Sequence, residues 1–195
     1  MNKLKELSIY IKKKGLNDAL KRIYSNYFHI LNFILYKRDL NDGFTGITLD
    51  SKFRCIEGNL ELLKRERKAR ENLPREFYVD QTHHGKLYYL VYDKDELAYI
   101  HWLFRKGEYS KFFKIQDEST IELNYNITLP KFRGNRLQAK TMNYICEDLK
   151  NKGYKMVIGA VSTGNILSMK GMARTGLKEF KRVKSYFSLV KKTKV

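Results

Sequence analysis

Apolar residues recur at two different spacings along the chain, and the spacing separates expected helices from expected strands. A period of three to four residues predicts an amphipathic helix, whereas short apolar or alternating runs predict strands. Helices are expected at residues 3–14, 17–34, 59–71, 136–152 and 165–175. Strands are expected at residues 44–47, 86–92, 97–104, 121–129, 155–161, 177–183 and 185–190.

The order of these elements predicts a mixed α/β fold. The helix at 136–152 lies between two expected strands, and such a strand–helix–strand unit joins parallel neighbours through a right-handed crossover. The strand pairs at residues 86–104 and 177–190 are close in sequence and are expected to be antiparallel. The predicted sheet therefore contains both kinds of pairing, with helices around it.

Composition adds a strong positive charge to this picture. Lys and Arg number 39 against 21 acidic residues, which gives a net charge of +18 and favours acidic partners such as nucleic acid, anionic lipid or phosphorylated small molecules. Cys55 and Cys146 stand far apart in no metal-ligand spacing, so we expect buried thiols in a reducing compartment and no metal. Neither a secretory signal nor an apolar run of about 20 residues is seen, and we expect a cytoplasmic protein.

The first 40 residues are basic as well as amphipathic. They carry nine basic residues against three acidic ones, and we expect a helical extension (1–40) ahead of the main domain (41–195). Two interpretations stay open. The extension lies on the anionic inner face of the membrane, or it packs on the domain or on a partner subunit. A homodimer is also left open.

The segment with the clearest chemistry runs from Thr128 to Gln138. It follows the strand at 121–129, contains Gly134 and opens the helix at 136–152. The first N–H groups of a helix have no internal partner, and the helix dipole favours negative charge there. A glycine-bearing loop between a strand and a helix is therefore a candidate phosphate site.

Two motifs resemble the GNAT superfamily of acyl-CoA N-acyltransferases. Pro130-Lys-Phe-Arg-Gly134 is similar to the family's cofactor loop, and Asn165-Ile-Leu-Ser168 with Gly176-Leu177 is similar to its second cofactor segment. The resemblance covers residues 44–191. It implies a mostly antiparallel sheet of six to seven strands with flanking helices and a parallel, splayed central pair. A weaker match, Ala98-Tyr-Ile-His-Trp102, is similar to relatives associated with surface polysaccharide clusters.

The resemblance also implies a function. The chain would transfer the acyl group of acetyl-CoA, as co-substrate, to an amine of a small molecule, with an amino sugar or its nucleotide-linked form as candidate acceptor. The residues implied to bind the cofactor are Ile127, Thr128, Leu129, Arg133, Gly134, Asn135, Arg136, Leu137, Gln138, Asn165 and Ser168. Arg136 and Gln138 stand where the family has glycines. Arg136 then either offers its guanidinium to a phosphate or spoils the site.

Amine acylation needs a base for the amine and a route for the thiol proton. Glu122, on the strand before the loop, and His101 are the candidate catalytic residues, since a carboxylate acting through water or an imidazole can take the proton. Met172 stands where the family often has a proton-donating tyrosine, and a thioether cannot donate. The alternative is a degenerate fold that acts as a membrane-peripheral or nucleic-acid-binding module without catalysis, although no nucleic-acid-binding motif stands out.

Overall fold

The computed structural model describes Asn17 and residues 30–43, 46–186 and 189–195. The helix expected at 3–14 and most of the one expected at 17–34 lie outside the described residues. Both interpretations of the N-terminal extension, contact with a membrane and packing on the domain or on a partner subunit, therefore stay predictions.

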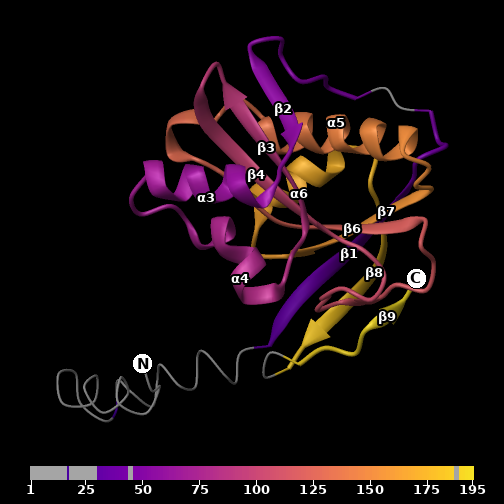
Figure 1. Ribbon diagram of the computed structural model, residues 1–195. Helices are drawn as coiled ribbons and strands as arrows, with labels where there is room; N and C mark the ends of the chain where they lie inside the picture. The colour runs from indigo at the N-terminus through magenta and orange to yellow at the C-terminus, as the bar shows by residue number, and fades with distance from the viewer. Residues whose placement is uncertain (1–16, 18–29, 44–45, 187–188) are drawn as a thin grey trace.

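A seven-stranded sheet forms the centre of the molecule, in the order β2-β3-β4-β6-β7-β1-β8 (Figure 1). Its strands are β1 Leu31–Asp39, β2 Phe53–Glu57, β3 Leu87–Asp93, β4 Glu96–Phe104, β6 Thr120–Thr128, β7 Met156–Ser162 and β8 Lys178–Ser185. All neighbours pair antiparallel except β6 and β7, which are parallel. A separate parallel pair joins β5 (Phe113–Lys114) to β9 (Thr193–Lys194). The predicted mixed, mostly antiparallel sheet with a parallel central pair is confirmed.

Helices cover both faces of this sheet. They are α3 Leu60–Ala69, α4 Val79–His83, α5 Leu137–Asn151 and α6 Ile166–Ala173, with 3-10 turns η1 at Arg75–Tyr78 and η2 at Pro130–Phe132. Residues of α5 share one buried cluster with Tyr99 and Leu103 of β4. The intervening Ile100 and Trp102 pack with Leu63 of α3 on the opposite face. The alternation of side chains along β4 thus contributes to two separate clusters, one on each face of the sheet.

Residues 31–39 correct the sequence prediction, because they form strand β1 rather than the end of a helix. Ile34 and Tyr36 pack into the core beneath α5, whereas Leu35 packs into a third cluster on the opposite face. A strand buried on both faces is a continuous apolar run, which periodicity alone does not separate from a buried helix. β1 pairs with both β7 and β8, so nine residues assigned to the N-terminal extension belong to the sheet.

Two further strand predictions are wrong. Gly46 and Ile47 lie outside any strand, and the edge strand is β2 instead; Phe44 and Thr45 fall outside the described residues. The second strand expected at 185–190 is reduced to one antiparallel bridge between Tyr186 and Leu189, because β8 takes β1 as its neighbour. In the part of the chain that the structure describes, no helix has the length and apolarity to cross a membrane.

Candidate functional site

The parallel pair β6–β7 opens into a fork. The two strands pair only from Thr120 opposite Met156 to Leu123 opposite Gly159. Beyond that point β6 continues on β4, and β7 continues on β1. The remaining residues of β6, 124–128, therefore turn one edge of the strand toward a gap in the sheet.

A bulge in β6 lies just past the vertex of the fork. Asn124 pairs with Trp102 and Asn126 with His101, so Tyr125 has no opposite residue in β4. Tyr125 also has a φ of +36°, a backbone conformation that non-glycine residues rarely adopt. A bulge bends its strand and changes the face toward which the following side chains point. Asn126 and Thr128 consequently line the gap.

Gly159 allows the fork to be packed closely at its vertex. A Cβ atom at this position would lie 2.9 Å from the Met172 Cε atom of α6 and 3.3 Å from the backbone oxygen of Leu123. Met172, which replaces the tyrosine that the resemblance implies, is buried. It contributes packing here rather than a proton, because a thioether has none to donate.

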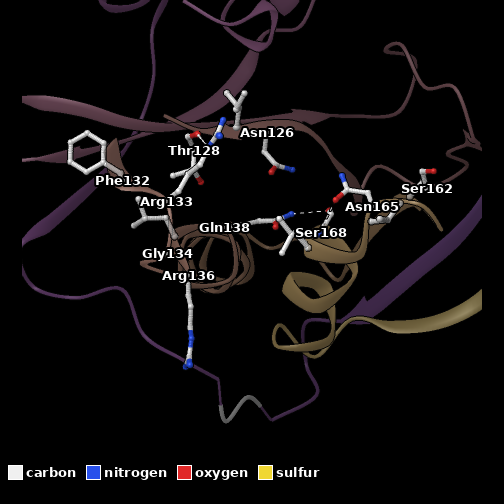
Figure 2. Close-up of a pocket in the computed structure, with 15 residues that line it drawn as sticks. Asn126, Thr128, Phe132, Arg133, Gly134, Arg136, Gln138, Ser162, Asn165 and Ser168 are labelled. Carbon is white, nitrogen blue, oxygen red and sulfur yellow. Dashed lines mark hydrogen bonds between the residues drawn. The ribbon is translucent and has the colours of Figure 1, made fainter. Parts of the chain in front are cut away.

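The gap is a cavity of about 600 Å³ between β6, β7 and the starts of α5 and α6 (Figure 2). Nine of the predicted cofactor residues line it: Ile127, Thr128, Arg133, Gly134, Arg136, Leu137, Gln138, Asn165 and Ser168. The other two do not. The Leu129 N–H donates to the Ala98 oxygen at 2.9 Å, and the Asn135 amide donates to the Phe132 oxygen at 3.0 Å.

Six residues of the lining were missed from the sequence. They are Asn126, Phe132, Ala160, Val161, Ser162 and Leu167. Asn126 lines the cavity because the bulge at Tyr125 changes the direction of its side chain. No local sequence signal marks a bulge that lacks glycine. The residues of β7 line the cavity because β6 and β7 separate. This separation depends on the pairing of β6 with β4 and of β7 with β1, which are distant in the sequence.

The start of α5 forms the anion-attracting wall of this cavity. The helix begins at Leu137, and no side chain caps its N-terminus. Gly134 has a φ of +85° and Arg136 a φ of +56°, so Arg136 keeps the left-handed backbone that a glycine would adopt there. Figure 2 shows the Arg136 side chain directed away from Asn126 and Asn165. Two arginines and no carboxylate are among the lining residues.

Gln138 packs against two residues of α6, Ser168 and Gly171. Its Nε2 atom donates to the Ser168 Oγ atom at 3.0 Å (Figure 2). A Cβ atom at Gly171 would lie 2.6 Å from the Gln138 Oε1 atom. The Gln138 side chain, at a position where the resemblance implies a glycine, therefore occupies the space beside Gly171 in α6.

Asn165 caps α6, since its side chain accepts from the Ser168 N–H at 3.0 Å. Asn165 also lines the cavity, and its amide NH₂ group is a hydrogen-bond donor there. The lining hydroxyls belong to Thr128, Ser162 and Ser168. The described lining includes no tyrosine, histidine, lysine, cysteine or carboxylate, and so no side chain that titrates near neutral pH.

Glu122 is buried in β6, one residue before the last β6–β7 pair. The Asn124 amide donates to one of its carboxylate oxygens at 2.9 Å, and the other oxygen has no hydrogen bond among the described residues. Burial raises the pKa of Glu122 to about 7, and interactions with Ser110 and Asn124 offset only part of this effect. Glu122 does not line the cavity, but it stands at the vertex of the fork with a pKa suited to proton transfer near neutral pH.

His101 is buried in β4 and does not line the cavity. Its Nδ1 atom and the Tyr99 hydroxyl lie 2.8 Å apart in a hydrogen bond, whereas its Nε2 atom has no partner among the described residues. Burial lowers the pKa of His101 to about 3. The imidazole is therefore neutral and enclosed.

No protein-family model matches the sequence, and no curated protein matches it. The structure is similar to a GNAT-family acetyltransferase from Colwellia psychrerythraea, with a TM-score of 0.55 and 13% identity over 88% of this chain and 61% of that one. A GCN5-related N-acetyltransferase from Sphaerobacter thermophilus gives a TM-score of 0.57 and 9% identity over 93% of this chain and 59% of that one.

A third similar structure is the GCN5-related glucosamine N-acetyltransferase region of a fungal multi-domain GH3 beta-N-acetylglucosaminidase. Its TM-score is 0.58, with 13% identity over 80% of this chain and 20% of that one. This chain thus spans less than two thirds of the length of each of the three proteins. At such identities the likeness concerns the backbone alone. The chain has the fold of the GNAT acetyltransferases.

Proposed function

We propose that this protein is a member of the GNAT superfamily and an acyl-CoA-dependent N-acyltransferase, with acetyl-CoA as donor and a small-molecule amine as acceptor. The observation that carries the proposal is the cavity in the fork of β6 and β7, whose wall is the uncapped start of α5. Helix starts bind phosphate groups through their free N–H groups and dipole. The fold of the similar structures is consistent with this use of the cavity.

The residues present fit a CoA thioester. The N–H groups at Leu137 and Gln138, with the Arg133 side chain, would hold the pyrophosphate. The free edge of β6 at residues 124–128, and the Asn165 amide, would bind the amide-bearing arm. When bound, the thioester supplies an activated acyl group. Backbone N–H groups of β6 would polarise its carbonyl, which is the usual way to stabilise the oxyanion of acyl transfer.

Glu122 is proposed as the base that takes the proton of the attacking amine, acting through water. A base works best when its pKa lies near the working pH, and the buried Glu122 meets this condition. The leaving thiolate has no titratable lining side chain from which to take a proton. With a thiol pKa of about 8.5, a thiolate is nevertheless a tolerable leaving group near neutral pH.

The acceptor we propose is an amino sugar, free or nucleotide-linked. The fungal neighbour is described as a glucosamine N-acetyltransferase region, and the net charge of +18 favours a phosphorylated acceptor. A polysaccharide-associated subgroup stays part of this proposal.

Free-thiol release from acetyl-CoA tests the proposal directly. The full chain is incubated with acetyl-CoA and glucosamine, its phosphate or a nucleotide-linked amino sugar, with acceptor-free reactions as controls. Acceptor-dependent thiol release supports the enzyme. CoA binding without release supports the non-catalytic alternative. Salt-dependent binding to oligonucleotides without CoA binding supports a nucleic-acid-binding module and contradicts the proposal.

A further inference from the structure

The large apolar side chains that the structure exposes are gathered at one edge of the fold. Among the described residues nine are exposed, and six of them belong to this edge: Ile30, Leu31, Ile166, Leu167, Tyr186 and Leu189. Leu167 is 81% exposed and Leu189 is 74% exposed. Single exposed hydrophobic residues are ordinary, but a concentration of them marks an interaction surface.

Backbone contacts hold these residues on neighbouring elements. The Thr163 N–H donates to the Asn32 oxygen at 2.9 Å, and α6 begins three residues later, at Ile166. Leu31 pairs with Ser185 at the end of β8, and the next residue, Tyr186, bridges to Leu189. Figure 1 shows the start of β1 beside the end of β8. We call this surface the β1–α6 edge.

The charge of the β1–α6 edge has one sign. Residues 30–34, 162–170, 182–186 and 189–191, which build it, contain four basic residues (Lys170, Arg182, Lys184 and Lys191) and no acidic one. Among the described residues only Arg182 of these four makes an ion pair, with Glu179. Exposed aliphatic groups beside unpaired cations match an anionic lipid surface, which takes up both at once.

A hollow in the β1–α6 edge is lined by both cationic and apolar side chains. It has a volume of about 350 Å³ and is lined by Asn32, Phe33, Thr163, Arg182, Val183 and Lys184. Two cations and two polar side chains can meet a phosphate or carboxylate group. The lining also includes an aromatic and a β-branched residue. The hollow therefore fits a lipid headgroup next to the start of its chains.

We propose that the β1–α6 edge docks on an anionic bilayer, with Ile166, Leu167 and Leu189 in the interface and the cations at the headgroups. A second copy of this chain fits poorly, because pairing the edge with itself brings like charges together. Residues 1–29 carry seven basic residues against two acidic ones, so the same repulsion opposes their covering it. Single-stranded nucleic acid binds by stacking on aromatic side chains, whereas the most exposed side chains of this edge, Leu167 and Leu189, are aliphatic.

The proposal has a consequence for the cavity. Leu167 belongs both to the β1–α6 edge and to the cavity lining. Docking therefore brings the mouth of the cavity to the headgroup layer. A membrane-anchored or amphiphilic acceptor would reach it there. The docking itself does not depend on the chemistry of the cavity and can be tested without it.

Vesicle flotation of the full chain tests the docking. Vesicles of phosphatidylcholine with and without phosphatidylglycerol are compared, and the variants are Ile166→Glu, Leu189→Glu and the matched control Leu60→Glu, an exposed leucine of α3. Flotation is expected only with phosphatidylglycerol. Each edge variant is expected to lower the partition coefficient at least about tenfold, since it removes an aliphatic group and adds a repelled carboxylate. The control is expected to bind within about twofold of wild type.

A fluorescent label shows the contact site independently of any loss of folding. Both native cysteines are buried, so a cysteine at Leu189 or, as control, at Leu60 can be labelled with a polarity-sensitive dye. Anionic vesicles are expected to shift the Leu189→Cys emission to the blue and to leave Leu60→Cys unchanged. Three results would overturn the proposal: no flotation of the wild-type chain, edge variants that float like wild type, or a dimer that only the edge variants dissociate.

Discussion

The two halves of β6 have different surroundings. Residues 120–123 all pair with β7, Glu122 and Leu123 also pair with β4, and all four residues are buried. Residues 124 and 126–128 pair with β4 alone, Tyr125 is the bulge, and all five residues are partly exposed. The first half is ordinary sheet interior. The second half offers backbone donors, polar side chains and an open edge.

The comparison shows how a site arises where regular structure stops. A strand buried and paired on both edges has no unused hydrogen-bonding groups. The bulge at Tyr125 ends that regularity, and bulges are often found beside active sites. Glu122 lies on the regular side of the boundary and the cavity on the other. The proposed function needs both, because proton transfer requires a shielded carboxyl group and cofactor binding requires free donors.

The largest effect is expected from Glu122→Gln. Loss of a general base typically costs about 10²–10⁴-fold in rate, so turnover of acetyl-CoA with amine should fall by about that factor while CoA affinity stays constant. Because the pKa of Glu122 is raised to about 7, wild-type activity should rise with pH through this value. Glu118→Gln, which alters an exposed carboxylate, should leave the pH profile unchanged. Equal loss in both variants would contradict the assignment.

The same substitution has a separate effect on folding. The folded protein holds the Glu122 proton more tightly than the unfolded chain, so stability is full below the ordinary carboxyl pKa of 4.5 and falls as the pH rises toward about 7. Urea unfolding between these pH values should show a smaller loss of stability for Glu122→Gln than for wild type. If the free energy of unfolding changed with pH identically in the two proteins, the Glu122 carboxyl group would not be buried in solution.

Gly159→Val tests the vertex of the fork. A Cβ atom there approaches the Leu123 backbone oxygen and Met172, and overpacking of this kind typically costs about 1–3 kcal/mol. The variant should unfold at lower urea concentration and bind CoA more weakly. Gly43→Ala is the control, since an added methyl group meets no atom within 4 Å. Unchanged stability and CoA affinity would show that the fork is not closed at this point.

Asn165→Ala and Asn59→Ala form a matched pair. Both asparagines cap a helix by accepting from the N–H three residues on, and loss of such a cap costs about 1 kcal/mol. Both variants should lose about this much stability. Only Asn165→Ala should also weaken CoA binding, because Asn59 lies outside the cavity lining. Equal CoA affinity in the two variants would show that Asn165 only caps α6 and does not contact CoA.

The smallest effect is expected from Arg136→Gly. Its backbone already has a positive φ, so glycine should keep or slightly raise stability, by less than about 1 kcal/mol. Because the side chain points away from the cavity in Figure 2, CoA affinity should change by less than about threefold at physiological salt. A loss of tenfold or more would instead make Arg136 a phosphate ligand. A tenfold gain would show that the native residue spoils the site.

The sequence predicted those parts of the molecule that depend on local pattern. Helix α5, the hairpin of β3 and β4, and the loop around Gly134 carry their own periodicity, turn residues and glycine. β1 was assigned to a helix, since its double burial depends on the distant strands β7 and β8. The bulge at Tyr125 and the accommodation of Gln138 by Gly171 were missed for the same reason: each depends on a partner far along the chain.

Calorimetric titration of the full chain with CoA tests the central claim, that the fork of β6 and β7 is a CoA site. We expect one molecule bound per chain. Ser168→Glu, which places a carboxylate in the cavity lining, should abolish the binding, whereas Ser119→Glu, on the loop before β6, should not. No heat of binding at millimolar CoA, or equal binding by the Ser168→Glu variant, would contradict the account.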